Sequence, residues 1–356
     1  MFTERHLLQN LPPEKLDDYL AGGWYRSGQS IFTCNFLIKQ GDLYTVVWTR
    51  LPLVDYKFRK GQRKLLRKNR ERFQIIIRPE QFTSEKEELY QVYREDFKGR
   101  LAPTLRSSLL DDGNQNIFDT WEICIYDAGK LVGFSIFDIG SKSIESIKAV
   151  YDPNYKQFSL GYYTMLEEVQ FAIDKGCEYY YPGYVVPGYK AFDYKLRAGI
   201  MEFFIPSTKD WKPMEKFDES RLLHKVMLEK LETLQSELGR RGIPTRLGIY
   251  PLYETVFWNL EPKYHLNFPL VLQIYPDFHN YRYLNYVFDP KEEQYRFIPC
   301  QGLQDTTEYF SHHLKPTPKI PVLTELLGMN DNFLAGDNPK EAIYRMKMWM
   351  SRQMFL

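Results

Sequence analysis

The sequence has few of the residues that build metal centres, and it has no long apolar run. Its four cysteines lie far apart, at Cys34, Cys124, Cys177 and Cys300, and form no C-x-x-C motif. A closed metal site needs several thiolates or imidazoles that converge on one point, so we expect no metal ion. Neither the N-terminal residues nor any later stretch is apolar over the length of a signal peptide or a membrane span. We therefore predict a cytoplasmic protein with no membrane partner.

An excess of charge of one sign is also missing. The 356 residues include 47 Lys and Arg against 46 Asp and Glu, which gives a formal net charge of +1. The molecule as a whole is therefore no polyanion binder, and contact with a nucleic acid would need a local basic patch. The sequence contains no P-loop, H-E-x-x-H or G-x-S-x-G motif, which disfavours the nucleotide, zinc-protease and serine-hydrolase chemistry of those motifs.

A local basic patch is present between residues 57 and 72. In this segment, KFRKGQRKLLRKNRER, only Glu71 is acidic. A helix here would carry Arg63, Lys64, Arg67 and Lys68 on about two turns, with almost no acidic partner at i,i+4. A run of cations is often only the solvated face of a helix. Because this one is so poorly neutralised, we interpret it as a binding site for a phosphate backbone.

Residues 73–206 alternate between strand and helix patterns in the order β-α-α-β-β-β-α-β-α-β. The best-marked helix in this part has Ser159 as its expected N-cap and Gly176 as its expected left-handed C-cap. We predict an α+β fold with a mixed sheet flanked by helices, similar to the GCN5-related N-acetyltransferases, in which two splayed parallel strands hold an acyl carrier. A small strand-rich module ending in the basic helix (1–72) would precede it, and an α+β extension of unknown role (207–356) would follow.

Several short motifs resemble, in order and in spacing, those of one enzyme family. They are Gly23-Trp24-Tyr25-Arg26-Ser27-Gly28, Arg50-Leu51-Pro52, Gly61-Gln62-Arg63-Lys64, Tyr151-Asp152-Pro153, Ser159-Leu160-Gly161, Tyr181-x-Gly183-Tyr184 and Tyr194-Lys195. The set resembles the arginyl-tRNA–protein transferases, a family that includes the bacterial aspartate/glutamate leucyltransferases. The resemblance covers roughly residues 10–200.

The resemblance implies a reaction and its partners. An amino acid, Arg or Leu, would move from a charged tRNA to the α-amine of a protein or peptide that begins with Asp or Glu. The ester of an aminoacyl-tRNA is already activated, so alignment of the two partners and stabilisation of the oxyanion suffice without a metal or a nucleotide. Family members carry an N-terminal cysteine cluster that can hold an iron–sulfur cluster. Only Cys34 lies in that region here, so we expect no cluster and no cofactor besides aminoacyl-tRNA as co-substrate.

The resemblance also suggests which residues act. Asp138, at the end of an apolar strand, could order the incoming amine or accept its proton, or it could simply cap the strand exit. Tyr184 and Lys195 could hold the terminal adenosine or phosphate of the tRNA, although Tyr184 would serve equally well in a core. Arg26 could pair with the acidic side chain of the acceptor, or lie unengaged at the surface. The basic residues at 63, 64, 67 and 68 would contact the tRNA backbone.

Two other functions stay open. A CoA-dependent N-acyltransferase of the same fold would cradle a pyrophosphate at the start of the central helix, where Leu160 and Tyr162 stand in place of small residues. A non-catalytic relative that binds tRNA or a peptide is the second alternative, because Ala191-Phe192 replaces the Lys-Met pair of the family. The sequence specifies neither the transferred amino acid nor the oligomeric state.

Overall fold

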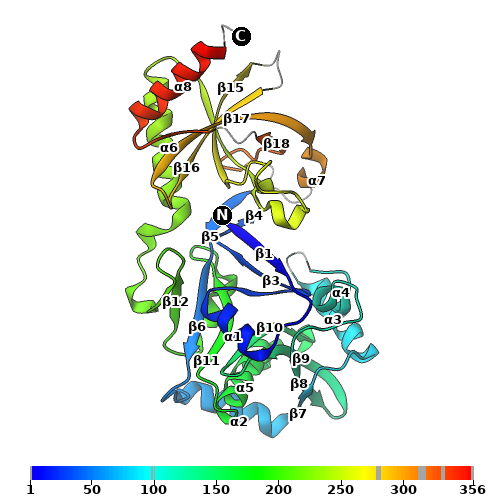
Figure 1. Cartoon of the computed structure of the whole chain (residues 1–356). Helices are drawn as coiled ribbons and strands as arrows, with labels where there is room; N and C mark the ends of the chain where they lie inside the picture. Colours follow the sequence, from blue (N-terminus) through cyan, green and yellow to red (C-terminus); the bar gives the residue numbers. More distant parts are fainter. Residues whose placement is uncertain are drawn as a thin grey trace. The chain divides into compact units, whose positions relative to one another are not determined.

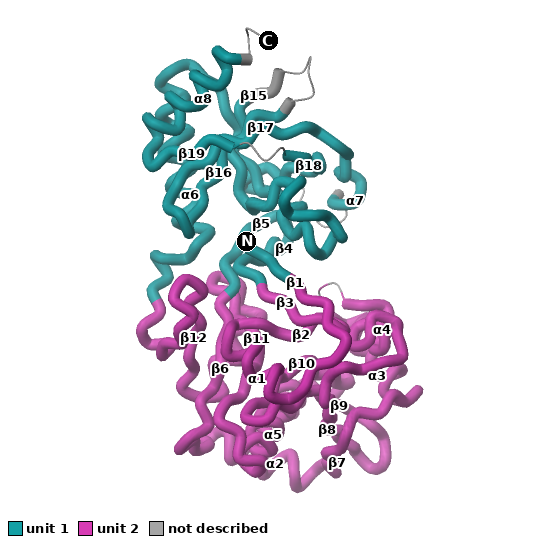
Figure 2. The backbone as a smooth tube through the Cα atoms, in the orientation of Figure 1, with its two compact units in different colours: residues 1–4, 34–46, 218–356 teal, residues 5–33, 47–217 magenta. Residues whose placement is uncertain are grey.

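The computed structural model of the chain describes residues 2–97, 99, 101–277, 282–311, 318–329 and 333–353. The chain forms two compact units (Figure 2): unit 1 comprises residues 1–4, 34–46 and 218–356, and unit 2 comprises residues 5–33 and 47–217. Residues 1–72, predicted as one N-terminal module, contribute to both units. The functional division into 1–72, 73–206 and 207–356 stays a prediction.

Unit 2 is built on an eight-stranded mixed sheet (Figure 1). Its strand order is β13-β12-β6-β11-β10-β9-β8-β7. In chain order the strands are β6 (Val47–Pro52), β7 (Gln74–Pro79), β8 (Thr120–Asp127), β9 (Lys130–Ile139), β10 (Ser143–Tyr151), β11 (Tyr179–Val185), β12 (Glu202–Ile205) and β13 (Asp210–Pro213). Strand β6 precedes the basic helix in the chain yet lies between β11 and β12, so the predicted N-terminal module supplies a strand of this sheet.

Helices cover both faces of the sheet. They are α2 (Lys60–Arg72), α3 (Ser84–Asp96), α4 (Leu105–Leu110) and α5 (Leu160–Asp174). Leu89 of α3 packs in one buried cluster with Phe134 of β9, whereas Val169 of α5 packs in another with Phe137. Because side chains three residues apart on a strand point to opposite faces, α3 and α5 lie on opposite sides of the sheet. This arrangement confirms the predicted α+β class.

The two central strands, β10 and β11, run parallel and separate after a short paired segment. Their pairing begins at Ser143 and Tyr179 and ends at Glu145 and Tyr181. Beyond that point β10 stays paired with β9, and β11 stays paired with β6. The predicted splayed strand pair is therefore confirmed.

The start of α5 differs from the prediction in one respect. Ser159 occupies the N-cap position, but its side chain makes no capping hydrogen bond, and its backbone is left-handed at φ 53°. The cause is a preceding 3-10 turn, η1 (Pro153–Phe158), which Ser159 closes by donating its N–H to Lys156. At the other end of the helix, Gly176 has φ +75° and so confirms the predicted left-handed cap.

Four further elements position the site in unit 2. They are α1 (Pro13–Ala21), β2 (Tyr25–Ser27), β3 (Ser30–Cys34) and the 3-10 segment η2 (Lys190–Arg197). Strands β2 and β3 pair with each other in a three-stranded sheet completed by β1 (Thr3–Leu7). Through this small sheet, residues near the start of the chain reach the place where β10 and β11 part.

Unit 1 is an α+β structure with its own core. Its larger sheet has the order β14-β15-β16-β17-β18, with β19 paired to β17, and β4 and β5 form a separate hairpin. Met227, Leu231, Leu234 and Leu238 of α6 fill the core at helical spacing. The bounds are β4 (Phe36–Lys39), β5 (Asp42–Thr45), α6 (Leu223–Gly239), β14 (Thr245–Ile249), β15 (Leu270–Asp277), β16 (Arg282–Asp289), β17 (Gln294–Asp305), α7 (Thr307–Ser311), β18 (Glu325–Met329), β19 (Leu334–Gly336) and α8 (Pro339–Gln353).

Candidate active site

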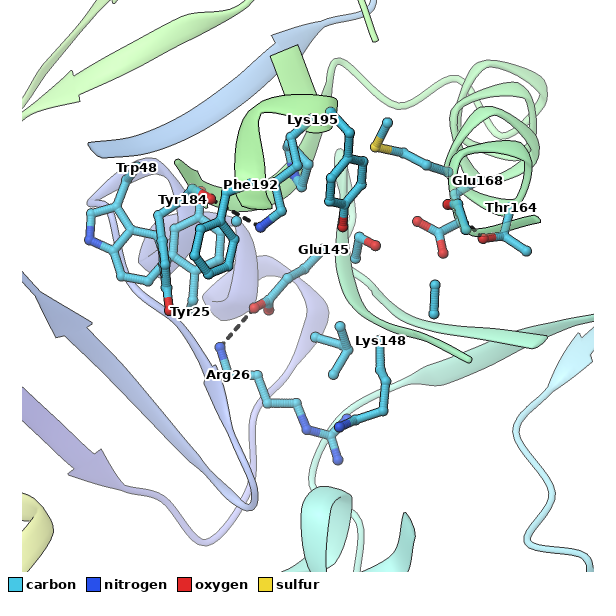
Figure 3. Close-up of a pocket in the computed structure, with 18 of the residues that line it drawn as sticks. Tyr25, Arg26, Trp48, Glu145, Lys148, Thr164, Glu168, Tyr184, Phe192 and Lys195 are labelled. Carbon is cyan, nitrogen blue, oxygen red and sulfur yellow. Dashed lines mark hydrogen bonds between the residues drawn. The ribbon is translucent and has the colours of Figure 1, made fainter. Parts of the chain in front are cut away.

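A pocket of about 240 Å³ lies where β10 and β11 part (Figure 3). All of its lining residues belong to unit 2, and most of them are aromatic or titratable. The aromatic residues are Tyr25, Phe32, Trp48, Tyr184, Phe192 and Tyr194, and the charged ones are Arg26, Glu145, Lys148, Glu168 and Lys195. Pockets for drug-sized ligands measure roughly 300–1,000 Å³. This smaller pocket therefore suits the reacting groups of a substrate rather than a whole nucleotide.

One wall of the pocket is a rigid aromatic surface. The rings of Tyr25 and Trp48 are stacked, with centroids 4.0 Å apart and 11° between their planes. Tyr184 stands edge-on to Trp48 at 5.0 Å, and Phe192 lies 5.2 Å from Tyr184 (Figure 3). An apolar side chain can pack against such a surface, and a base can stack on it, because both bury apolar area there.

Lys195 reaches the same wall from η2. Its Nζ donates to the backbone oxygen of Tyr184 at 3.0 Å and lies 5.4 Å from the centre of the Tyr184 ring. Burial lowers the pKa of Lys195 to about 7, because no carboxylate offsets its lost hydration. Gly183 has φ +88°, and a Cβ there would come within 3.1 Å of this amine. The structure thus brings together Tyr184 and Lys195, two of the residues predicted from the sequence.

Arg26 and Asp138 lie together in the interior beside the pocket. The Arg26 Nη1 donates to Asp138 Oδ1 at 2.9 Å, and both side chains are almost completely buried. The rest of the guanidinium donates to the backbone oxygens of Gly28 and Leu109 and to Thr120 Oγ1. Because its donors are engaged in this way, the geometry favours a structural role for Arg26 over direct contact with a substrate. The predicted contacts of Arg26 with an acceptor and of Asp138 with an amine stay predictions.

Two buried carboxyl groups in the pocket were not predicted from the sequence. Glu145 is 2% exposed and lies directly opposite Asp138 in the β9–β10 register. Glu168, on α5, accepts a hydrogen bond from the Tyr180 hydroxyl at 2.7 Å, and burial raises its pKa to about 7. The one available signal for Glu145 was an acidic residue near the start of a predicted strand.

The basic helix is confirmed as α2, and one buried residue ties it to the site. Its four predicted tRNA contacts, at positions 63, 64, 67 and 68, are exposed. Gln62, by contrast, is buried, and its Nε2 donates to the Ala198 oxygen at 2.8 Å and to the Tyr162 hydroxyl at 3.1 Å. Because Ala198 directly follows η2, this bond couples the basic helix to the segment that bears Lys195.

The described part of the chain holds no group of three or more His, Cys, Asp or Glu residues that could bind a metal ion. None of its helices is long and apolar enough to cross a membrane. Of the histidines, His279, His312 and His313 lie outside the described residues.

Parts of this chain are similar to known proteins. The family described as "Arginine-tRNA-protein transferase, C terminus" matches residues 85–204. An aspartate/glutamate leucyltransferase of Leptospira interrogans is 32% identical over 151 residues, which are 41% of this chain and 58% of that protein. One from Campylobacter jejuni is 28% identical over 199 residues, which are 54% of this chain and 80% of that protein. Among solved structures, a GCN5-related N-acetyltransferase from Kribbella flavida aligns with a TM-score of 0.25 at 12% identity, over 50% of this chain and 55% of that one.

The mixed sheet with its parted central strands gives unit 2 the architecture that the sequence predicted. Residues 85–204 match the model of the arginine-tRNA–protein transferase family, in agreement with the motifs in the sequence. The chain spans 58% of the length of the Leptospira relative, and residues after 204 lie outside the family match.

Proposed function

We propose that this chain is a cytoplasmic aminoacyl-tRNA–protein transferase, which moves Arg or Leu from a charged tRNA to the α-amine of a protein that begins with Asp or Glu. The observation that supports this proposal is the pocket at the parting of β10 and β11, most of whose lining lies within the family-matched residues 85–204. Its aromatic wall can hold the aminoacyl group or stack the base of the terminal adenosine, with Tyr184 and Lys195 beside them. The pocket is too small for more of the tRNA, which would extend along the protein surface.

The two alternatives make different demands on the pocket. A CoA enzyme needs open backbone at the start of α5, but Leu160 is buried in the core and the Tyr162 hydroxyl donates to the Arg197 oxygen at 2.9 Å. Both bulky side chains are thus held in place, which disfavours a pyrophosphate there. A non-catalytic relative would keep the pocket without turnover, and Phe192, which stands in place of a family residue, is part of the aromatic wall.

A transfer assay separates these functions. The protein is incubated with tRNA charged with labelled Arg or Leu and with peptides that begin with Asp, Glu or Ala. We expect label on the acidic peptides and none on an N-acetylated copy. If no charged tRNA labels any peptide, the enzymatic proposal is wrong. Micromolar binding of acetyl-CoA in isothermal titration would instead support the CoA enzyme.

The basic helix yields a prediction about salt. Changing Arg63, Lys64, Arg67 and Lys68 to Gln should weaken tRNA binding and reduce the slope of log affinity against log salt by up to about 3, because each phosphate contact releases counterions. The measurement is a salt titration of tRNA binding by filter retention.

A matched control removes four exposed cations elsewhere in unit 2, namely Lys175, Lys209, Lys212 and Lys216. The net charge of this variant falls equally, so a long-range field effect would change both variants alike. A wild-type slope in the helix variant would mean that the helix is only a solvated face.

A further inference from the structure

The Glu145 carboxyl group has one oxygen without a partner. It is 2% exposed, and its Oε1 accepts the backbone N–H of Arg26 at 2.7 Å (Figure 3). Its Oε2 is buried and has no hydrogen-bond partner. An unsatisfied buried acceptor costs about 1–3 kcal/mol, more when it is charged, and such groups in native proteins call for an explanation. Because Glu145 lines the pocket, a ligand that donates to Oε2 would satisfy this oxygen.

The charges around Glu145 do not balance. Asp138 and Glu145 face each other on β9 and β10, but the one guanidinium beside them, that of Arg26, donates to Asp138. Glu145 forms no ion pair with any residue of the described chain. Among the other titratable groups at the pocket, Lys195 on η2 donates to a backbone oxygen and Glu168 on α5 accepts from Tyr180.

Two more titratable groups of the pocket lie on β10 and β2. Lys148, further along β10, places its amine 5.4 Å from the centre of the Tyr90 ring, and the Tyr25 hydroxyl on β2 donates to a backbone oxygen of β6. Neither supplies a counter-ion for Glu145. A cation brought by a ligand would complete the pairing of the two facing carboxylates.

We propose that Glu145 receives the α-ammonium group of the acceptor peptide and takes one proton from it. This inference rests on the proposed function. Transfer of that proton converts the carboxylate to a carboxylic acid and the ammonium to a free amine. The amine nitrogen then forms a bond to the ester carbonyl carbon, and the bond from that carbon to the tRNA ribose oxygen breaks. The nitrogen loses a second proton, which the departing ribose oxygen gains, and Glu145 later releases its proton to water.

The electrostatics of the site suit this step. Burial, together with the neighbouring charge of Asp138, raises the pKa of Glu145 well above its ordinary value. That direction brings it toward the pKa of an α-amino group, which is about 7.7–8.0 in a free peptide. Proton transfer between groups of similar pKa is close to balanced, as a general base requires. The same shift in pKa favours the protonated form of Glu145 when no cation faces it, and an arriving ammonium group favours the carboxylate, so we expect binding to release protons.

Binding without tRNA tests the inference separately from transfer. Isothermal titration compares a peptide that begins with Asp and has a free α-amine with its N-acetylated copy. We expect the wild-type protein to prefer the free amine by at least about 10-fold, which is a modest value for one charge-assisted contact. Titration in buffers of different ionisation enthalpy should show release of up to one proton. Equal affinity for the two peptides, or no binding of either, would overturn the proposal without any variant.

The substitution Glu145→Gln keeps the shape of the side chain and an oxygen for the Arg26 N–H. It should abolish the preference for the free amine, and in the transfer assay it should lower kcat by about 100-fold or more. Glu178→Gln is the control, since this partly exposed carboxylate just before β11 lies outside the pocket lining and pairs with Lys142 at 3.1 Å. A folded Glu145→Gln protein with wild-type preference or wild-type kcat would sink the proposal.

Two other outcomes show whether the proposed function or the role of Glu145 is wrong. Loss of the preference in Glu145→Gln, in a protein that transfers no amino acid, would leave the amine site standing and remove the proposed function. If Glu145→Gln weakens binding of leucine or arginine methyl ester and leaves the peptides unaffected, the carboxylate serves the donor, and the assignment to the acceptor is wrong.

Discussion

Arg26→Met is expected to lower the free energy of unfolding by about 3–5 kcal/mol, because it leaves the Asp138 carboxylate buried without its counter-ion. Nη1 of Arg26 lies 2.9 Å from Oδ1 of Asp138, and the two side chains are 1% and 0% exposed. The same guanidinium also lies 4.2 Å from the centre of the Phe118 ring. Typical domains are stable by only about 5–15 kcal/mol, so this one change would remove a large part of the total. Urea denaturation, followed by circular dichroism, measures the loss.

A second substitution distinguishes the unpaired charge from the lost hydrogen bonds. Asp138→Asn removes the charge and keeps an acceptor for the Thr120 hydroxyl, which donates to Asp138 at 2.6 Å. The double variant Arg26→Met/Asp138→Asn should therefore regain part of the stability that Arg26→Met loses. If it regains none, the bonds to Gly28 and Leu109 explain the effect and the ion pair does not.

An exposed pair provides the matched control. Arg72 pairs with Asp127 at 2.7 Å, but its side chain is 55% exposed, so water screens the interaction. Arg72→Met should cost less than about 1 kcal/mol. Equal losses in Arg72→Met and Arg26→Met would contradict the argument that burial decides the effect.

The order of elements in unit 2 could be predicted because each boundary carries its own local signal. From β7 to β12 the strands and helices follow the predicted order, with the 3-10 segment η2 in the place of the last predicted helix. The place of β6 could not be predicted. It pairs with β11, for example Trp48 with Tyr184, and pairing between strands so distant in sequence depends on packing rather than on local pattern. That pairing brings Trp48 into the pocket.

The site was only partly predictable for a similar reason. Tyr184 and Lys195 follow from motifs and do line the pocket. Asp138 drew attention because it ends an apolar strand, but the register places Glu145 directly across from it on the same face. A bulge between Ser146 and Lys148 then alters which side chains of β10 face the pocket. Neither the register nor the bulge leaves a trace in the sequence.

Two pocket residues should make stability depend on pH in opposite ways. Burial raises the pKa of Glu168 to about 7, above its value in an unfolded chain, so the folded state binds more protons between about pH 4.5 and 7. The stability that Glu168 contributes is complete below pH 4.5 and is lost as the pH rises through 7. Burial lowers the pKa of Lys195 from 10.5 to about 7, so the unfolded state binds more protons between those values. Stability therefore rises with pH from about 7 to 10.5.

The contributions of Glu168 and Lys195 to the free energy of unfolding are both least favourable near pH 7. The two variants should therefore depend on pH in different ways. At pH 7, Glu168→Gln should be more stable than the wild type by up to roughly 3 kcal/mol, since one pKa unit is worth about 1.4 kcal/mol. Its advantage should vanish at pH 4.5, where Glu168 is already protonated in both states, and persist at pH 9.5. Lys195→Met should show the reverse, with an advantage at pH 4.5 and 7 that shrinks at pH 9.5. Water screens Lys195 because its side chain is only partly buried, so its effect should be the smaller.

The measurement is urea unfolding of the wild type and both variants at pH 4.5, 7 and 9.5. Differences from the wild type cancel the groups common to all three proteins, among them Glu254 in unit 1, whose pKa burial also raises to about 7. If either variant is less stable than the wild type at pH 7, the hydrogen bond to Tyr180 or to the Tyr184 oxygen outweighs desolvation, and the corresponding pKa shift is wrong. If both are more stable at pH 7 and Lys195→Met loses transfer activity, the pocket retains destabilising groups because catalysis needs them.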